Sequence, residues 1–303
     1  MLRATAGGGI TFGGAPGGHA LEVATPASAA NRVLVSGAAA GASVSVQAQG
    51  ADANIGLALA PRGTGALSAN VPDGLAAGGG ARGANAVDWQ SVRTNSSRVA
   101  GGTNAVIGGG ESNAATNTAA VVAGGSNNLA TGPYSWSPGG LQADTRGQLG
   151  KGAWASGRFA ANGDAQAAEH VLRRQGTDAT PVRLTADGSG QGASNTVNLP
   201  NNGTFLVRLM VAARQVGGRP APRVTAPAGP LEALVRRGAT TASTVLLGGG
   251  AALAPSFADA AAAAWRLAVA ADTTNGGLAI SGTGEANKTI YWVARILSAE
   301  VVG

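Results

Sequence analysis

The chain has 303 residues, of which 4% are aromatic, 12% are charged and 50 are glycine. Glycine at this level without a Gly-X-Y period excludes collagen, and the absence of cysteine excludes disulfide scaffolds and thiolate metal sites. The net charge of +6 comes almost entirely from arginines that are scattered along the chain. Because a nucleic-acid footprint needs a basic face, we expect no nucleic-acid partner.

The sequence also argues against membrane insertion. The stretch from Met1 to Gly18 lacks the continuous apolar segment of a signal peptide. No run of about 18 uncharged apolar residues occurs, since Arg266 interrupts the richest candidate, 260–271. We therefore expect a protein that is made in the cytoplasm without a signal peptide and does not enter a membrane.

The first 60 residues predict short strands separated by turns. Residues 1–25 are rich in glycine and contain two brief strand candidates, 10–12 and 21–23. They form either a disordered tail or a docking arm that becomes ordered against a partner. Farther along, alternating apolar residues predict three half-buried strands, around Val33 and Val35, Val44 and Val46, and residues 55–59.

Residues 96–166 repeat a short phrase at a spacing of roughly 15 residues, which is too short for helical repeats and typical of a β-solenoid. Each copy joins small or β-branched residues to a glycine turn, and the copies are AVIGGGESNAAT (105–116), AVVAGGSNNLAT (120–131), WSPGGLQADT (136–145) and AWASGRFAANGD (153–164). One unit has too few large apolar side chains to form a core alone. We therefore predict coils that stack on one another and on other subunits, in a narrow trimeric segment.

The remaining segments predict a linker and a second β-rich domain. Residues 72–86 read as a Gly/Ala-rich linker. After Gln166, strand-forming runs between Gly, Pro and Asn turns predict an antiparallel sandwich or jelly-roll-like domain. The runs are 171–174, 182–184, 196–199, 204–213, 231–235, 243–247, 265–269, 277–281 and 290–297. The alanines at 260–264 predict one or two helical turns.

No set of residues has a spacing typical of catalysis or of metal binding. His19 and His170 are far apart, and His170 is expected at the surface near the end of a strand. Segment 282–289 approaches a P-loop, but Asn287 occupies the position of the second glycine and a strand follows it. Sparse carboxylates near the domain junction are expected in turns and in solvent rather than as the active pair of a glycosidase. They are Asp144, Asp164, Glu169, Asp178 and Asp187.

Two side-chain types are suited to carbohydrate. Flat rings for sugar stacking are offered by Trp136 and Trp154 and by Trp265 and Trp292, although the last two are expected to anchor the core. Scattered arginines could meet anionic glycans or form pairs between subunits, and examples are Arg208, Arg214 and Arg223. We predict no catalytic, cofactor-binding or metal site, and we assign no residue to receptor contact.

Several phrases resemble fibre or spike proteins of tailed bacteriophages or of phage-like gene transfer particles. Residues 52–67, DANIGLALAPRGTGAL, are similar to a strand and turn phrase that is common in these fibres. The Ala-x-x-Gly-Gly and Ala-Ser-Gly-x-x-Ala units resemble the head repeats of trimeric adhesins, with a departure at Trp136-Ser-Pro138. Resemblance to the carboxy-terminal domain of the same fibres rests on LPNNG (199–203), ADTTNG (271–276) and GEANKTIYWVAR (284–295).

The resemblance implies an all-β, elongated homotrimer with a β-roll or β-prism repeat segment and a carboxy-terminal β-sandwich. The parts expected are a docking arm (1–25), a short-strand shaft or attachment domain (26–75), a Gly/Ala linker (76–95), head-like repeats (96–166) and a receptor-binding domain (167–303).

The function that the resemblance implies is that of a virion component. Its amino-terminal part docks on a capsid, portal or baseplate protein, and its carboxy-terminal part binds a host surface polysaccharide. A polysaccharide-cleaving spike and a bacterial trimeric surface adhesin are the alternatives. The prediction preferred on the sequence is that the chain is not an enzyme and uses no cofactor.

Overall fold

The computed structural model describes residues 10–12, 21–23, 30–217, 223–225, 231–248 and 257–303. The chain separates into two compact units, Met1–Ala60 and Pro61–Gly303. The all-β prediction is confirmed, since short 3-10 turns at Thr241–Ser243 and Ala260–Ala262 are the helical elements of the described residues. The predicted helical segment at 260–264 is therefore a single turn. Within the described part of the chain, no helix has the length and apolar character needed to cross a membrane.

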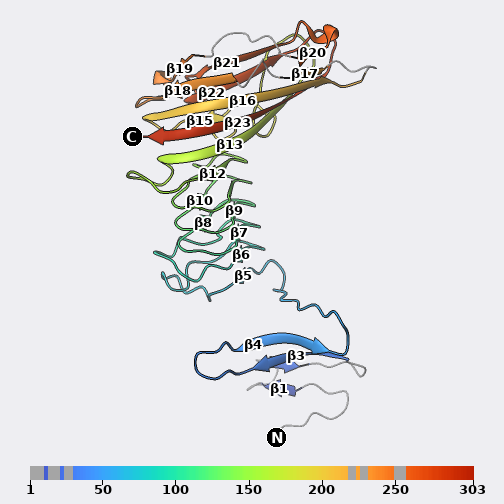
Figure 1. Ribbon diagram of the computed structural model, residues 1–303, viewed down its shortest axis with the longest axis vertical. Helices are drawn as coiled ribbons and strands as arrows, with labels where there is room; N and C mark the ends of the chain where they lie inside the picture. The colour runs from blue at the N-terminus through green and yellow to red at the C-terminus, as the bar shows by residue number, and fades with distance from the viewer. Residues whose placement is uncertain (1–9, 13–20, 24–29, 218–222, 226–230, 249–256) are drawn as a thin grey trace. The chain divides into compact units, whose positions relative to one another are not determined.

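The first unit consists of two antiparallel strand pairs (Figure 1). They are β1 (Ile10–Phe12) with β2 (Leu21–Val23), and β3 (Asn31–Ser36) with β4 (Ser45–Gly50). Two of the three strands predicted for this unit are confirmed as β3 and β4, but residues 55–59 form no strand, and Val33 and Val35 are exposed rather than half-buried. The physical reason is that none of the buried apolar clusters includes a described residue of this unit. His19 lies outside the described residues.

The second unit begins with a stack of parallel coils. One face is formed by β5 (Leu67–Ser68), β6 (Val87–Asp88), β7 (Val106–Ile107), β9 (Val121–Val122) and β11 (Trp136–Ser137), and another by β8 (Ala114–Ala115) and β10 (Leu129–Ala130). Val106 pairs with Val121, and Val121 with Trp136, so each of these steps advances by the repeat that the sequence predicts. The interior is lined by small side chains such as Ala105, Ala120 and Val122.

Glycine is required at one corner of each coil. Gly110, Gly125 and Gly140 all have a positive φ, between 80° and 91°. A Cβ atom at these positions would lie 2.1, 2.2 and 2.4 Å, respectively, from a carbonyl oxygen of the next coil. The second residue of each Gly-Gly pair is therefore fixed both by backbone conformation and by the closeness of the neighbouring coil.

Buried asparagines join successive coils. Asn128 donates its backbone N–H to Oδ1 of Asn113 (2.9 Å), and its own Oδ1 accepts the N–H of Ala143 (3.0 Å). The Nδ2 of Asn128 donates to the carbonyl oxygens of Gly124 and Gly140. These bonds satisfy backbone groups at corners where regular strand pairing is interrupted.

Replacing Asn128 with alanine is expected to lower the free energy of unfolding by about 3 kcal/mol, because the change leaves buried backbone groups without partners. Thermal and urea unfolding followed by circular dichroism would measure the loss. Ser126→Ala, which removes a more exposed hydroxyl from the same coil, is the matched control. Equal stability of the two variants would contradict the role given to Asn128.

The sheet of the coils continues into the carboxy-terminal part without a break. β12 (Gly152–Trp154) pairs in parallel with β11 and antiparallel with β13 (Ala165–Gly176). Beyond it follow β23 (Ile290–Val302), β16 (Gly203–Gln215), β18 (Leu231–Arg236) and β19 (Val245–Leu247). Two short strands lie at the far end of β16, namely β17 (Arg223–Thr225) and β20 (Phe257–Ala258).

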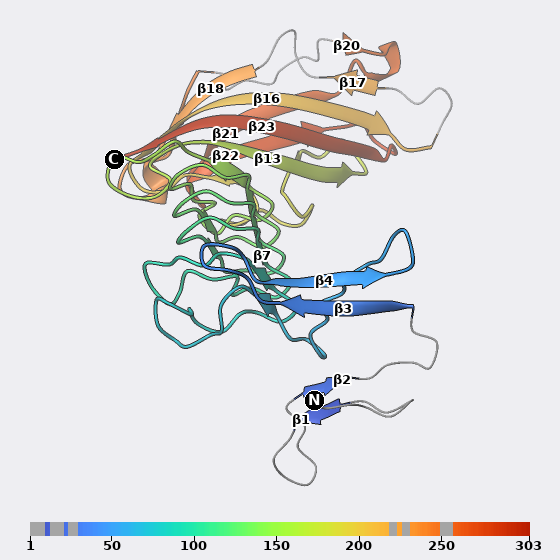
Figure 2. The same ribbon diagram turned by 60° about the horizontal axis from the view of Figure 1, so that its bottom comes forward.

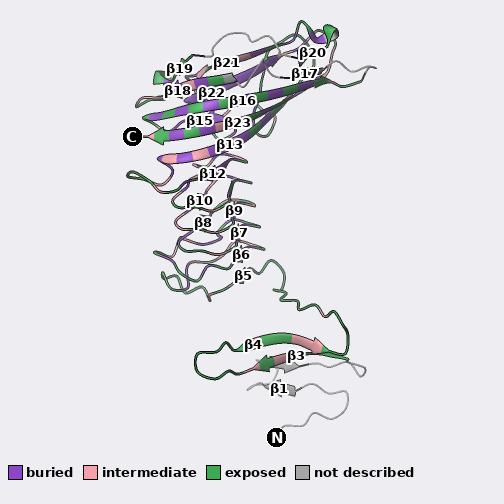
Figure 3. Cartoon of the chain, viewed as in Figure 1, coloured by how far each residue is buried: buried purple, intermediate pink, exposed green. Residues whose placement is uncertain are grey.

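A second, smaller sheet covers one face of these long strands. It contains β14 (Val182–Arg183), β15 (Val197–Asn198), β21 (Arg266–Asp272) and β22 (Gly277–Thr283). The main core lies between the two sheets, and Phe205 of β16 and Ile280 of β22 belong to it. Buried and exposed residues alternate along β16 and β23, as Figure 3 shows. The opposite face of the long strands is therefore left open.

Candidate functional site

The outward face of the continuous sheet points away from the coil interior and from the second sheet. Across six adjacent strands, the registers place one uncharged residue of each strand in a row on this face: Trp154, Ala167, Ala299, Leu206, Leu234 and Leu247. None of them is buried, and Leu206 is 48% exposed. An apolar row of this length on an open sheet face is unusual for a surface that meets only water.

The coils carry a second row that is offset by two residues from the first, since Trp136 pairs with Gly152 and Gly152 with Glu169, whereas the first row begins at Trp154. Their outward residues are Leu67, Val87, Val106, Val121 and Trp136, each opposite the next in the sheet. Trp136 lies opposite Gly152, where a Cβ atom would be 2.5 Å from Nε1 of the Trp136 ring, so the ring covers that glycine. We call the eleven residues of the two rows the apolar seam. At about 4.8 Å per strand, the seam is roughly 50 Å long.

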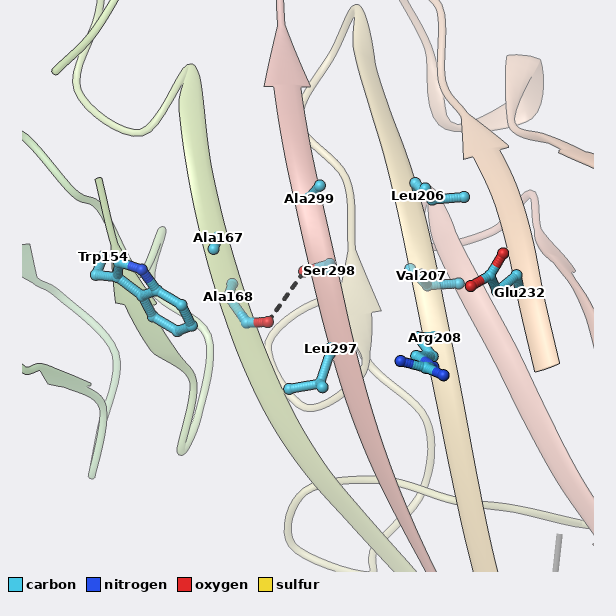
Figure 4. A pocket seen from close by; sticks show the side chains of 10 residues that line it. All are labelled: Trp154, Ala167, Ala168, Leu206, Val207, Arg208, Glu232, Leu297, Ser298 and Ala299. Atoms are coloured by element: carbon cyan, nitrogen blue, oxygen red, sulfur yellow. Dashed lines mark hydrogen bonds between the residues drawn. The ribbon is translucent and has the colours of Figure 1, made fainter. Parts of the chain in front are cut away.

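Two clefts flank Trp154 on this face. The first, of about 420 Å³, lies between Trp136 and Trp154, which are 43% and 44% exposed. The second, of about 360 Å³, lies on the other side of Trp154 and extends to Glu232 of β18 (Figure 4). Its lining residues are Trp154, Ala167, Ala168, Leu206, Val207, Arg208, Glu232, Leu297, Ser298 and Ala299. Apolar atoms dominate both clefts, so they are suited to apolar side chains or to the flat faces of sugars.

A charged row lies beside the seam. Glu169, Leu297, Arg208 and Glu232 are opposite one another on four neighbouring strands. Glu169 accepts two hydrogen bonds from Arg295, at 2.6 and 3.2 Å, in an exposed ion pair. Among the described residues, no ion pair joins Arg208 to Glu232. The outward face thus combines an uncharged line with a neighbouring line of alternating charge.

A buried ionic cluster lies on the inner face, where the coils meet the two packed sheets formed by β13 to β23, which we call the sandwich. Lys151 Nζ is 2.9 Å from each carboxylate oxygen of Glu300, and both side chains are fully buried. Arg146 Nη1 lies 2.6 Å from Oε2 of Glu300, and Gln166 donates to the same oxygen. The Phe205 ring completes the cluster, 5.4 Å from the Arg146 guanidinium carbon and 5.8 Å from Lys151 Nζ.

The electrostatics of this cluster favour ionised Glu300. Burial by itself raises the pKa of Glu300, but Lys151, Arg146 and the hydrogen bond from Gln166 outweigh it and hold the pKa at about 2. Burial lowers the pKa of Lys151, and Glu300 offsets this in part. Glu300 lines neither cleft, so the cluster joins the coils to the sandwich rather than meeting a ligand.

His170 differs from the expectation drawn from the sequence. Its ring is buried in the middle of β13 and lies 2.6 Å, through Nε2, from Oε1 of Gln148. The prediction of a surface position is wrong because β13 extends over 165–176 and its alternation turns His170 inward. Burial first, and then the charge of Lys151, lower the pKa of His170 to about 3, so the ring is neutral at ordinary pH.

Four of the carboxylates named from the sequence accept hydrogen bonds from residues close to them in the chain. Asp164 accepts the N–H groups of Phe159, Ala160 and Ala161, and Asp178 accepts that of Thr180. Against the effect of burial, hydrogen bonds from its neighbours lower the pKa of Asp187 to about 2. Burial raises the pKa of Asp144, which accepts the N–H of Arg146.

The tryptophans divide into two groups. Trp265 and Trp292 are buried in the core, with ring centroids 6.0 Å apart, whereas Trp136 and Trp154 are on the outward face. Arg208 and Arg214 are also on this face, and Arg223 lies opposite Arg214 in the sheet. Segment 282–289 consists of the end of β22 and the turn 284–289 that joins it to β23.

Sequence reasoning missed the junction cluster. A signal was available in the sequence. Glu300 is separated from the apolar Trp292 and Ile296 by even numbers of residues, and side chains at such spacings point to the same face of a strand, here the inner face. Within the described residues, no group of three or more potential metal ligands is found.

The sequence matches no protein-family model, and no curated protein is detectably similar to it. Among solved structures, the chain is similar to a tailspike protein, gp49, of Acinetobacter baumannii bacteriophage Fri1, described as a capsular polysaccharide depolymerase. The identity is 9%, the TM-score is 0.24, and the match covers 72% of this chain and 38% of that one. It is also similar to the tailspike of Acinetobacter phage vB_ApiP_P1, with 10% identity, a TM-score of 0.23 and coverage of 74% and 46%. The chain thus spans less than half the length of either spike.

These comparisons correct one prediction. The chain was expected not to be an enzyme, and this is contradicted by the first neighbour, which is described as a capsular polysaccharide depolymerase. The expectation of a purely non-enzymatic protein is therefore not kept.

Proposed function

We propose that the chain is a homotrimeric spike of a phage or phage-like particle, in which three copies associate through the apolar seam. The observation that carries this proposal is the seam itself, whose two rows, offset by two residues at β12, together take one uncharged residue from each of eleven strands of one sheet. An exposed apolar surface of this length would favour aggregation in water. Copies arranged around an axis parallel to the seam would each contribute one such surface to a shared core.

The coils supply a second reason for association. Their interior is built from alanine, valine and a single isoleucine, so one coil stack removes little apolar area from water. Burial of the outward residues between copies would supply the missing stabilisation. The resemblance of the repeats to the heads of trimeric adhesins and phage fibres favours three copies over two.

In this proposal the particle anchors the amino-terminal part, through a capsid, portal or baseplate protein. The carboxy-terminal sandwich, carried at the end of the stacked coils, binds a host surface polysaccharide. Three sandwiches on one spike would bind a repetitive polymer with an avidity greater than that of one site.

Sedimentation equilibrium of the purified protein tests the assembly. The expected mass is three times the chain mass of 29.1 kDa, and a monomer across the micromolar range would contradict the proposal. The same preparation, mixed with surface polysaccharide from strains that the particle infects, is expected to be retained on the polymer. Release of oligosaccharides in that mixture would assign a cleaving spike, the alternative function, whereas absence of both retention and release would contradict polysaccharide recognition.

A further inference from the structure

We propose that the distal outward face of the sandwich binds an acidic polysaccharide, through carboxylate groups on its sugars. The inference rests on the proposed function, because it names the class of polymer that the spike would meet. It concerns the ends of β13, β16 and β23 that lie away from the apolar seam.

Four arginines form a zigzag on this face. Successive rows across β13, β23 and β16 are Glu169, Leu297 and Arg208; Val171, Arg295 and Met210; Arg173, Val293 and Ala212; and Gln175, Tyr291 and Arg214. Each row contains one arginine, and all four arginines are exposed. The steps from Arg208 to Arg295 and from Arg295 to Arg173 are diagonals between adjacent strands, about 7–8 Å long, whereas β23 lies between Arg173 and Arg214. We call these four residues the arginine zigzag.

The zigzag carries more positive charge than the carboxylates beside it offset. On β13, β23 and β16 Glu169 is the sole carboxylate of these rows and pairs with Arg295, and Glu232 of β18 lies opposite Arg208. No hydrogen bond or ion pair to another described residue engages the side chains of Arg173, Arg208 or Arg214. A guanidinium group presents a planar fork that matches a carboxylate in a bidentate manner, so this face is complementary to a polymer bearing carboxylates at intervals.

The residues between the arginines suit a sugar chain. Tyr291, Val293 and Val171 are about half exposed and offer flat or apolar surface beside the charges. The apolar faces of sugar rings can pack on such groups while their carboxylates reach the arginines. Nucleic acid fits less well, because its dense phosphates would meet Glu169 and the nearby Glu232.

The distal position keeps this face separate from the seam. β12 pairs only with residues 167–169 of β13, so the rest of β13 projects past the coils, and β16 and β23 run beside it (Figure 2). From Leu206 in the seam to Arg214, the strand spans roughly 27 Å. Three copies joined along the seam would therefore leave the two outer rows, with Arg173 and Arg214, available, whereas Arg208 lies beside the seam.

Polygalacturonate, a polymer of uronic acid, is the probe for the test. The intact protein is expected to bind it, more weakly as salt rises. The double variant Arg173→Gln with Arg214→Gln is expected to bind about tenfold more weakly. It should retain the oligomeric mass and the unfolding midpoint of the native protein, because both side chains are exposed. Arg62→Gln with Arg158→Gln removes the same charge from exposed positions elsewhere and is the matched control.

Three results would overturn the inference: equal weakening by the two double variants, equal binding of carboxyl-reduced polygalacturonate, or tighter binding of duplex DNA than of the acidic polymer. Failure here is distinguishable from failure of the proposed function. A trimer that is retained on native host polysaccharide but ignores polygalacturonate would sustain the spike and reject the acidic ligand. A monomer would instead reject the spike.

Discussion

Replacement of Glu300 by glutamine is expected to lower the free energy of unfolding by about 3–5 kcal/mol. Glu300 is the counter-charge of a fully buried Lys151 and of Arg146, and its four closest polar contacts lie between 2.6 and 2.9 Å. A neutral amide would leave Lys151 and Arg146 without the carboxylate that they contact, and Lys151 is fully buried. The cluster joins the last coil to the sandwich, so the loss should uncouple these two parts.

Glu169→Gln is the matched control for Glu300→Gln. It also removes a carboxylate from an ion pair with arginine, but that pair is exposed, so little change is expected. Urea unfolding of both variants at equal protein concentration would measure the difference. Indistinguishable midpoints would show that the buried cluster does not hold the junction together.

The same pair of proteins gives a pH test. The pKa of Glu300 in the folded chain, about 2, lies below its ordinary value of 4.5. Ionised Glu300 therefore contributes its full stability above pH 4.5, and this contribution is lost as the pH falls toward 2. The difference in Tm between the native protein and Glu300→Gln is expected to shrink across this window. A constant difference would contradict the assigned charge state.

Replacement of Val121 by aspartate is expected to convert the trimer into monomers. Val121 is the outward residue of β9 in the middle of the coil part of the seam. Around a shared axis, three copies of the variant would bring three carboxylates into an apolar environment without partners, at a cost of several kcal/mol each. The fold of one chain should survive, because Val122, not Val121, faces the coil interior.

Phe159→Asp is the control for the seam. Phe159 is the more exposed apolar side chain, at 80%, but it lies in the loop after β12 and outside the seam. Sedimentation equilibrium should give a single-chain mass for Val121→Asp and an unchanged trimer for Phe159→Asp. A trimeric Val121→Asp protein would place the interface between copies on another face.

Local patterns were enough to predict much of the fold. The repeat of residues 105–145 predicted coils of short strands, because a glycine is needed wherever two coils approach closely. The alternation in 204–213 and 290–297 predicted the two longest strands. Alternation at 55–59 wrongly predicted a strand, because alternation alone does not reveal whether a partner strand is present.

The candidate site was harder to predict from the sequence than the fold. Trp136 and Trp154 were singled out as possible sugar-stacking residues, yet the sequence did not show that Trp154 lies in one row with Leu206 and Leu247, or that Trp136 ends the neighbouring row of the coils. The registers that join these residues link positions as far apart as Ala167 and Ala299. Arg208 and Arg214 were noted as scattered charges, and only strand pairing brings them beside Arg173 and Arg295.

By itself, then, the sequence determined the all-β class, the period of the coils and the positions of most long strands. These properties depend on neighbours a few residues apart, through glycine conformation and strand alternation. The tertiary structure decided that the coils and the sandwich share one sheet, that His170 and Glu300 point inward, and that the uncharged residues form one seam. Each of these depends on which distant strands pair and in which register, because a shift by one residue would turn every side chain of a strand to the opposite face.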